Sequence, residues 1–127
     1  MKYLIDTHIL IWFLEGNTSL SKRAKNLIID TDNQIFVSTA SLWKMTIKMS
    51  IGKLKLSQTL PEIMEQMKSD GISILSIQEE HLLTLLALPF HHNDPFDRLL
   101  IAQAQTENLV LITDDNKFNL YNISILN

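Results

Sequence analysis

QIFVSTASLWKMTIKMS, residues 34–50, changes its hydrophobic period near the middle. Residues 34–37 form a short, mostly apolar run that is typical of a buried strand. Residues 39–50 instead repeat apolar side chains every three or four positions, as one face of a helix does. A strand that passes directly into a helix is typical of proteins in which helical crossovers join parallel strands. This stretch therefore predicts an α/β protein.

The rest of the chain shows the same alternation of short apolar runs and helical periods. Most of the expected strands are apolar on both sides, which is typical of a parallel sheet covered by helices on each face. We therefore expect an α/β fold with a central parallel sheet of about five strands. The expected strands are residues 3–5, 34–37, 72–75, 109–113 and 122–126, and the expected helices are residues 21–30, 39–50, 60–68, 78–87 and 95–107.

The composition limits the classes of protein to which the chain can belong. Its 127 residues are 46% apolar, enough for one domain with a core, so we expect residues 1–127 to form a single domain. A formal net charge of -3 does not predict a broadly basic, nucleic-acid-binding surface. The chain has no cysteine, no signal-peptide pattern and no apolar run that approaches the ~18–20 residues of a membrane span. We therefore expect a cytoplasmic protein with no membrane contact.

Acidic side chains follow two of the expected strands and begin one of the helices. Asp6 follows the first strand in YLIDTH, and Asp114 and Asp115 follow the fourth in VLITDD. Asp97 lies in DPFDRLLIAQA, at the start of the helix that precedes the fourth strand. Open parallel sheets bind ligands beyond the carboxyl ends of their strands, near the point where the strand order reverses. We therefore expect these acids to share one crevice.

Each acid taken singly also has a structural interpretation. Asp6 is a candidate N-cap for a helix that begins directly after it, and Asp94, which precedes Pro95, is the expected N-cap of the helix at residues 95–107. Asp97 occupies the position of the reciprocal residue in a capping box. Taken together the acids are harder to explain, because carboxylates that converge repel one another unless a cation binds them. Oxygen ligands of this kind suit Mg²⁺ or Mn²⁺.

The histidines are weaker candidates for a functional site. His91 and His92 are adjacent in an expected loop, and adjacent side chains point apart in an extended chain, so we expect exposed loop residues rather than metal ligands. For the single histidines His8 and His81 we expect structural roles. The chain has no glycine-rich phosphate-binding loop and no GxSxG nucleophile motif.

The chain resembles the PIN-domain ribonucleases, and among them the VapC-like toxins of bacterial toxin–antitoxin pairs. YLIDTHILIW resembles the first motif of the family, VSTASLWKMTIKMSIGKL the second, and HHNDPFDRLLIAQAQTENLVLITDD the third and fourth. The motifs occur in the family's order and cover nearly the whole chain. The resemblance implies a three-layer α/β/α fold around a parallel sheet. It also implies an acidic site that binds one or two divalent ions and cleaves single-stranded or looped RNA.

The resemblance assigns roles to particular residues of this site. Asp6, Asp97 and Asp115 fall on the family's catalytic, metal-binding acids, with Mg²⁺ or Mn²⁺ as the cofactor. Asp6 and Asp97 are the expected main ligands, and Asp115 is expected to act directly or through a bound water. Thr7 and Thr113 are expected to help position water or phosphate through their hydroxyl groups.

Lys44 departs from the family pattern. Where the second motif of the family has Ser-Leu-Trp followed by glutamate, this chain has Lys44 after residues 41–43. The change alters the local charge by two units and places a cation at the positive end of a helix dipole, which costs roughly 0.3–1 kcal/mol. We expect the ammonium of Lys44 to lie within ion-pair reach of Asp6 or Asp97. We also expect metal binding and RNA cleavage to be sharply reduced.

The resemblance also implies partners, namely an RNA substrate, a cognate VapB-like antitoxin whose tail fills a groove, and a second copy of the chain in a homodimer. The apolar run at residues 9–14 is longer than one helix face requires, so part of it is a candidate partner surface. The candidate contacts to RNA phosphates, for which an ordinary solvated surface is the alternative, are Lys44, Lys48, Lys53, Lys55 and Arg98.

Two functions therefore remain open. The first is a metal-dependent endoribonuclease toxin that Lys44 attenuates or inactivates. The second is a catalytically silent PIN-like module that binds an antitoxin or RNA. A flavodoxin-like signalling domain is not favoured, because residues 75–77, where the third strand ends, contain no acidic phosphoacceptor.

Overall fold

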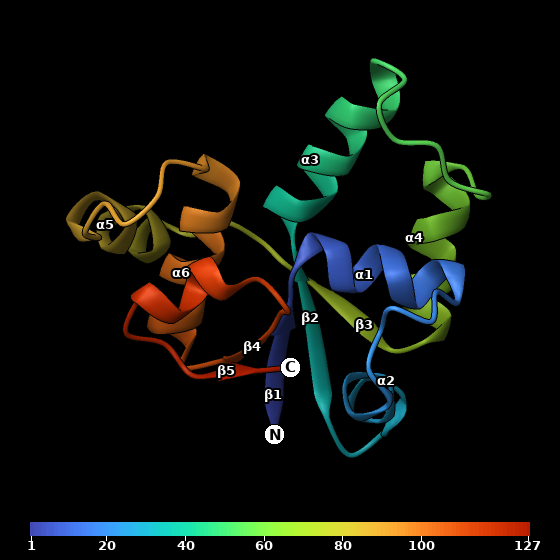
Figure 1. Cartoon of the computed structure of the whole chain (residues 1–127), viewed down its shortest axis with the longest axis horizontal. Helices are drawn as coiled ribbons and strands as arrows, with labels where there is room; N and C mark the ends of the chain where they lie inside the picture. Colours follow the sequence, from blue (N-terminus) through green and yellow to red (C-terminus); the bar gives the residue numbers. More distant parts are fainter.

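A parallel sheet lies at the centre of the molecule, whose computed structural model describes residues 1–127. Every expected strand forms, and the strands lie in the order β3-β2-β1-β4-β5 with all neighbours parallel (Figure 1). The prediction of an α/β fold with about five parallel strands is therefore confirmed. The strands are β1 (Lys2–Ile5), β2 (Gln34–Ser38), β3 (Ile72–Leu75), β4 (Val110–Ile112) and β5 (Ile125–Leu126).

The strand order reverses at β1. From β1 the chain moves to β2 and then to β3 on one side, whereas the next strand, β4, pairs with β1 on the other side. Ile5, the last residue of β1, therefore aligns with both Val37 of β2 and Ile112 of β4. The residues that follow β1 and β4, Asp6 and Thr113, consequently lie at the switch point where open parallel sheets bind ligands.

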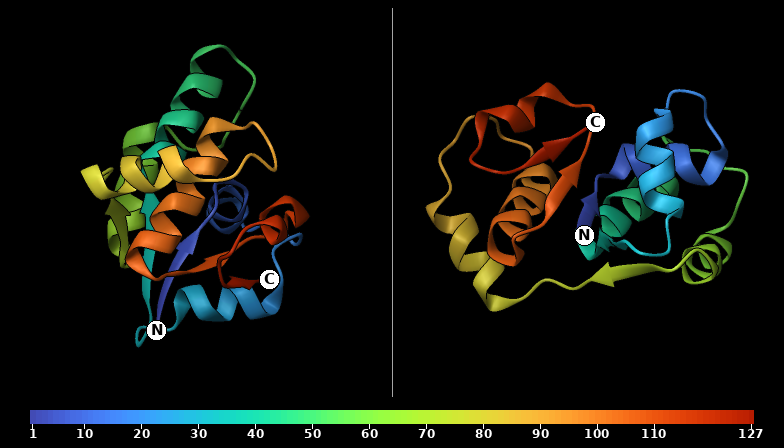
Figure 2. Two further views of the ribbon diagram at one scale, coloured as in Figure 1. Left: turned by 90° about the vertical axis from the view of Figure 1, so that its left-hand side faces the viewer. Right: turned by 90° about the horizontal axis from the view of Figure 1, so that it is seen from below.

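Helices cover both faces of the sheet and give the molecule three layers. Helices α5 and α6 lie on one side, and α1, α2 and α4 lie on the other, as Figures 1 and 2 show. Helix α3 begins directly after β2 and carries Lys44 in its second turn. The helices are α1 (Thr7–Glu15), α2 (Lys22–Ile29), α3 (Thr39–Ser50), α4 (Leu60–Ser69), α5 (Glu79–Ala87) and α6 (Pro95–Glu107), followed by the short 3-10 helix η1 (Asn116–Leu120).

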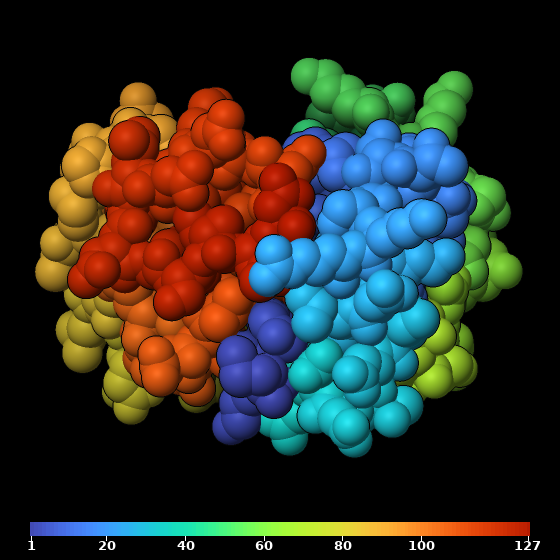
Figure 3. Space-filling view, turned by 60° about the horizontal axis from the view of Figure 1, so that its bottom comes forward, coloured from blue at the N-terminus to red at the C-terminus, as the bar shows by residue number.

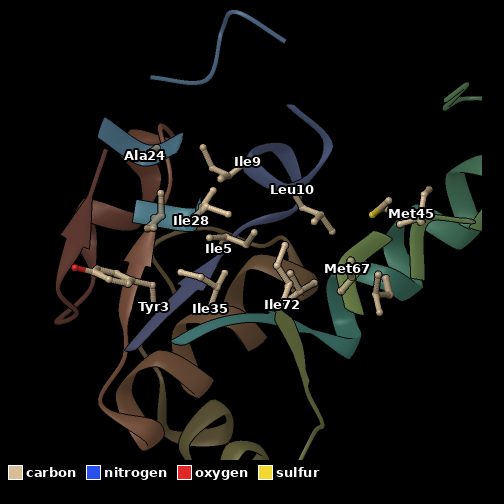
Figure 4. Packing of buried hydrophobic residues seen from close by; sticks show 14 residues of the cluster. Tyr3, Ile5, Ile9, Leu10, Ala24, Ile28, Ile35, Met45, Met67 and Ile72 are labelled. Carbon is tan, nitrogen blue, oxygen red and sulfur yellow. The ribbon is translucent and has the colours of Figure 1, made fainter. Parts of the chain in front are cut away.

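Two hydrophobic clusters, one on each face of the sheet, fix the position of β1. Ile5 belongs to a cluster of 14 buried residues that packs the sheet against α1 to α4 (Figure 4). Leu4 belongs to a cluster of nine that includes Leu100 and Ile101 of α6. Both clusters draw on β1 because successive side chains of a strand point to opposite faces. The end of β1, and with it Asp6, is therefore held from both sides.

Three elements differ from the expectation. Helix α1 is not among the expected helices, because residues 9–14 are apolar all round and show no clear period. The sequence indicates only that Asp6 is a candidate cap for a helix there, and Asp6 does cap α1. The start of that run is buried, and residues 11–14 are half-buried around the larger cluster. Helix η1 is not expected, and β5 is shorter than residues 122–126. None of the helices is long and apolar enough to span a bilayer.

Candidate active site

Asp6 follows β1 and is 4% exposed. Its Oδ1 accepts a hydrogen bond from the N–H of Ile9 at 2.8 Å, and its Oδ2 accepts a short hydrogen bond from the hydroxyl of Thr113. The pKa of Asp6 is raised from 3.8 to about 6. Burial is the main cause, and the charge of Asp114 acts in the same direction, whereas the two hydrogen bonds and the charge of His8 lower the pKa. A carboxylate that is poorly solvated at neutral pH is one that a cation would stabilise.

Thr113 joins the end of β4 to Asp6 and to the following turn. Its buried hydroxyl donates to Asp6 and accepts a hydrogen bond from the N–H of Asp115 at 3.1 Å. Asp115 in turn caps η1, since its Oδ1 accepts a hydrogen bond from the N–H of Lys117 at 2.9 Å. Thr113 therefore uses its proton to orient Asp6. On the opposite side of the molecule, where the strands begin, the C-terminal segment, in orange and red, also lies against the N-terminal segment, in blue (Figure 3).

Asp97 lies in the first turn of α6, and 19% of its side chain is exposed. Burial raises the pKa of its carboxyl group. The neighbouring carboxylates of Asp94 and Asp115 raise this pKa further, whereas the charges of Lys44 and His92 lower it. Asp97 and Asp115, two acids that the sequence places together, are thus close enough for the charge of one to affect the other.

Asp94 caps α6, as predicted, because its Oδ1 accepts hydrogen bonds from the N–H groups of Phe96 at 2.9 Å and Asp97 at 3.1 Å. Its Oδ2 lies 3.4 Å from Nζ of Lys44. Burial alone would raise the pKa of Asp94, but the hydrogen bond from Asp97 and the charge of Lys44 hold it below its usual value. The expected ion pair between Lys44 and Asp6 or Asp97 is therefore wrong, because the partner of Lys44 is Asp94.

The ammonium of Lys44 nevertheless faces the start of α6 and not bulk solvent. Only 16% of the Lys44 side chain is exposed, and its Nζ lies 5.8 Å from the centre of the Phe96 ring. The charge of Lys44 also lowers the pKa of Asp97. Lys44 lies in the second turn of α3, beyond the first turn where the helix dipole acts most strongly, and its charge is compensated by the ion pair with Asp94 and the contact with Phe96.

The acids fit a divalent cation by their chemistry, although the geometry is incomplete. Burial and neighbouring carboxylates raise the pKa values of Asp6 and Asp97, and carboxylate oxygens are the ligands that Mg²⁺ and Mn²⁺ prefer. In this conformation no three His, Asp or Glu side chains lie close enough together to hold a metal ion. The positive charge of Lys44 beside Asp97 opposes a second cation there.

His92 lies beside Asp97, which sequence reasoning does not anticipate. Its side chain is 10% exposed, and its Nε2 lies 3.7 Å from Oδ2 of Asp97. Its Nδ1 lies 3.1 Å from the hydroxyl oxygen of Tyr121. The expectation of exposed loop histidines therefore holds for His91 but is wrong for His92. The only sequence signal was the position of His92 five residues before Asp97.

The other two histidines also differ from each other. His81 of α5 is completely buried. Its Nδ1 accepts a hydrogen bond from the N–H of Gln78 at 2.9 Å, and its Nε2 lies 3.1 Å from a carboxylate oxygen of Glu107 on α6. The predicted structural role of His81 is therefore confirmed. For His8, which is exposed in the first turn of α1 with its ring 6.2 Å from that of Trp12, a structural role stays a prediction.

Arg98 does not contribute to a surface for RNA phosphates. It is 5% exposed, and its guanidinium group donates hydrogen bonds to the carbonyl oxygens of Pro89 at 2.9 Å and Leu88 at 3.2 Å. The ring of Phe90 lies over the guanidinium group, with 3.8 Å between the ring centre and Cζ. Arg98 therefore anchors the segment between α5 and α6. The expectation that Arg98 contacts RNA phosphates is wrong.

A family model described as PIN domain matches residues 3–123. The match spans nearly the whole chain and both ends of the site, from Asp6 to Asp115. The chain therefore belongs to the PIN domain family, as its motifs predicted. The five-stranded parallel sheet between two helical layers is the PIN fold that the family implies.

Solved structures of toxin–antitoxin proteins share this fold. The chain is similar to a protein in VapBC2 from Rickettsia felis bound to a DNA fragment from its promoter, with a TM-score of 0.76 and 18% identity over 100% of this chain and 98% of the other. It is also similar to a chain of FitAcB from Neisseria gonorrhoeae, with a TM-score of 0.67 and 15% identity over 98% and 96% of the two chains. VapBC-1 from nontypeable Haemophilus influenzae gives a TM-score of 0.67 and 18% identity over 100% and 98%. No sequence match was found among curated proteins.

Proposed function

We propose that this protein is a VapC-type toxin of a toxin–antitoxin pair, a metal-dependent endoribonuclease whose activity Lys44 attenuates. The observation that carries the proposal is the placement of Asp6 and Asp97. Both are acids of a PIN domain with a raised pKa, one at the switch point of the sheet and the other at the start of α6. Acids whose environments disfavour their ionised form are typical of sites that act on a charged ligand.

Each residue of the site has a defined part in this proposal. Asp6 and Asp97 would hold Mg²⁺ or Mn²⁺ through their oxygen atoms, and Asp115 would do so directly or through water. When bound, such an ion would lower the pKa of a water molecule and stabilise charge on the scissile phosphate. Thr113 fixes the orientation of Asp6 by donating its hydroxyl proton to Oδ2, which leaves other lone pairs of that carboxylate available for a cation.

Lys44 opposes this chemistry in two ways. It removes the acid that the PIN motif has after Ser-Leu-Trp, and it introduces a positive charge that already interacts with Asp97. Its ion pair with Asp94 holds that charge at the start of α6, where the proposed metal ion needs a negatively charged ligand. Both effects weaken metal binding, so we expect this chain to have much less ribonuclease activity than a variant with glutamate at position 44.

The same ion pair favours a second candidate function, a catalytically silent PIN module that binds an antitoxin or RNA. Lys44 is mostly buried and paired with Asp94, so a positive charge is already held beside the acids without a metal ion. Such a protein would retain the fold and its partner surfaces. The two candidates differ in whether restoring the acid restores the chemistry.

The partners that we propose are an RNA, a VapB-like antitoxin and a second copy of the chain. The similarity to the proteins of VapBC2, FitAcB and VapBC-1 supports an antitoxin partner for this protein. Lys53 and Lys55 follow α3 and are exposed, and Lys48 lies on the same helix as Lys44. These lysines would supply the local positive charge that an acidic protein needs to bind phosphates.

Lys44→Glu is the variant that tests the proposal. We expect it to arrest growth when induced, to cleave RNA in the presence of Mg²⁺ or Mn²⁺, and to bind Mn²⁺ at least tenfold more tightly in titration calorimetry than the chain with Lys44. Lys44→Glu combined with Asp6→Asn should lose all three gains. Lys48→Glu is the matched control, because it makes the same change of charge one turn further along α3.

The outcomes separate the two candidates. If Lys44→Glu gains neither toxicity nor cleavage, the attenuated nuclease is wrong and the silent binding module is favoured. If Lys48→Glu gains as much as Lys44→Glu, the effect comes from net charge and the assignment of Lys44 is wrong. Cleavage that survives Asp6→Asn would indicate a contaminating nuclease or a different site.

A further inference from the structure

Tyr121 organises the segment that precedes α6. Its hydroxyl oxygen accepts hydrogen bonds from the backbone N–H of His91 at 3.1 Å and of His92 at 3.2 Å, and from Nη1 of Arg98 at 3.3 Å. The rings of both histidines also make edge contacts with the Tyr121 ring, with 4.9 Å and 5.4 Å between centres. Tyr121 is itself 6% exposed and packs in the smaller hydrophobic cluster. It therefore occupies one fixed position.

These contacts determine what the Tyr121 proton does. Three N–H groups point at one phenolic oxygen, which has only two lone pairs to accept them, and none of the three can act as an acceptor. The remaining neighbour is Nδ1 of His92, at 3.1 Å. The Tyr121 O–H group must then donate to Nδ1, so the neutral His92 ring carries its proton on Nε2.

The Nε2–H group of His92 faces Asp97. This nitrogen is buried and has no hydrogen-bond partner within the usual distance, and Oδ2 of Asp97 lies 3.7 Å away. The gap is too short for a bridging water, and a rotation of the Asp97 side chain that shortened it by about half an ångström would give a normal hydrogen bond. A buried N–H group without a partner carries a desolvation penalty that this bond removes. The ring of Phe118 also makes an edge contact with that of His92, with 6.2 Å between the ring centres.

We infer that His92 is a positioning residue for Asp97, held by Tyr121 in the Nε2–H tautomer so that it orients the Asp97 carboxylate by donating a hydrogen bond to it. The inference rests on the proposed function only in naming Asp97 as a metal ligand. Carboxylates that bind metals are commonly oriented by a hydrogen bond from a neighbouring side chain, and the loss of such a neighbour typically lowers metal affinity 10–100-fold. The C-terminal segment, which supplies Tyr121 and Phe118, thus acts on the site through His92.

The first test reads the tautomer without any metal. At about pH 8, above the ordinary histidine pKa of about 6.5, ¹⁵N NMR of the EDTA-treated protein should show a protonated Nε2 and a bare Nδ1 for His92. Tyr121→Phe removes the O–H donor and should shift His92 toward the other tautomer or a mixture. A wild-type ring protonated on Nδ1, or one unchanged by Tyr121→Phe, would overturn the inference. Circular dichroism verifies that the variant is folded.

The second test reads the orientation of Asp97 and uses two substitutions of His92. His92→Gln can place an amide donor near the position of Nε2, whereas His92→Leu has no donor. The ¹³C resonance of the Asp97 carboxyl group should move in the leucine variant and stay close to the wild-type position in the glutamine variant. Equal shifts in both variants would show that His92 only fills space, and the inference would be wrong.

Metal binding distinguishes this inference from the proposed function. In the Lys44→Glu background, His92→Leu should weaken Mn²⁺ binding 10–100-fold in titration calorimetry, and His92→Gln should retain most of the affinity. If the Lys44→Glu protein binds no Mn²⁺ at all, the proposed metal site is wrong, while the metal-free spectra still decide the role of His92. If it binds Mn²⁺ and His92→Leu leaves the affinity unchanged, the role of His92 is wrong and the metal site stands.

Discussion

At the scale of single residues, Asp6 makes the stability of this protein depend on pH. Its pKa is about 6 in the folded protein against an ordinary value of 3.8, so folding favours the protonated acid. A raised pKa contributes stability that is fully present below the ordinary value and is lost as the pH rises through the folded value. The difference of about two pKa units corresponds to roughly 3 kcal/mol.

Asp6→Asn should remove this dependence. We expect the free energy of unfolding of the natural chain to fall by up to about 3 kcal/mol relative to Asp6→Asn between pH 4 and pH 7.5. The comparison uses urea denaturation in EDTA at both pH values, and the other ionisable groups cancel because they are common to both proteins. Parallel pH profiles would show that burial does not hold the Asp6 proton.

The residues of the site were predictable from the sequence to the extent that they follow strands or start helices. Asp6 and Asp97 could be placed because a strand end and a helix start are visible in the hydrophobic period. The partner of Lys44 could not be predicted, since Asp94 and Asp97 share one helical turn and only side-chain geometry decides between them. His92 was missed because its burial depends on Tyr121, a residue 29 positions away along the chain.

At the scale of elements, α5 carries an apolar surface that its own chain does not cover. One side of the helix is held on α6 through buried His81, whereas Leu82, Leu83 and Leu86 are 52%, 68% and 85% exposed. Leu86 and Phe90 also line a hollow of about 340 Å³ beside the start of α6. This apolar surface is the candidate interface of the proposed homodimer, since a symmetric dimer buries the same surface of both copies.

Leu86→Glu should therefore convert the proposed homodimer into a monomer. Burying each leucine stabilises an interface by about 1.5–3 kcal/mol, and a buried unpaired carboxylate is strongly unfavourable. Sedimentation velocity over a range of concentrations measures the result. Leu120→Glu on η1, where the leucine is 56% exposed, is the matched control and should remain dimeric. A monomeric natural chain would contradict the homodimer, and a dimeric Leu86→Glu would place the interface elsewhere.

The contrast between polar and apolar positions along a helix explains which helices the sequence predicts well. Helices α3 and α6 have the expected bounds, because polar residues interrupt the apolar ones in each sequence and a capping side chain, that of Ser38 or Asp94, precedes each helix. Helix α1 has no such contrast, since residues 9–14 are apolar on every side. It is defined by its ends, where Asp6 caps the first turn and Gly16, with a φ of 63°, adopts the left-handed conformation that ends the helix.

At the scale of the whole molecule, the two hydrophobic clusters are coupled through the sheet they share. Strand β1 contributes Ile5 to the larger cluster and Leu4 to the smaller, so neither cluster can come apart without disturbing the strand that carries Asp6. A molecule built in this way should unfold as one cooperative unit, which is the single domain expected from the length of the chain. Two completely buried isoleucines probe the two faces, Ile63 of α4 and Ile101 of α6.

Ile63→Val and Ile101→Val delete the same methyl group from opposite faces of the sheet, and each should lower the free energy of unfolding by about 0.5–1.5 kcal/mol. In a Trp43→Phe background, the remaining tryptophan, Trp12 on α1, reports on the larger cluster alone. We expect Ile101→Val to shift the urea midpoint of Trp12 fluorescence by the same amount as the midpoint of far-UV circular dichroism, with an unchanged slope. A fluorescence midpoint that stays at the background value while the circular dichroism midpoint falls would show that the two faces unfold independently. Coincident shifts in both variants would instead mean that a substitution in the smaller cluster destabilises the larger cluster by the same amount, because β1 lies between the two clusters and contributes side chains to both.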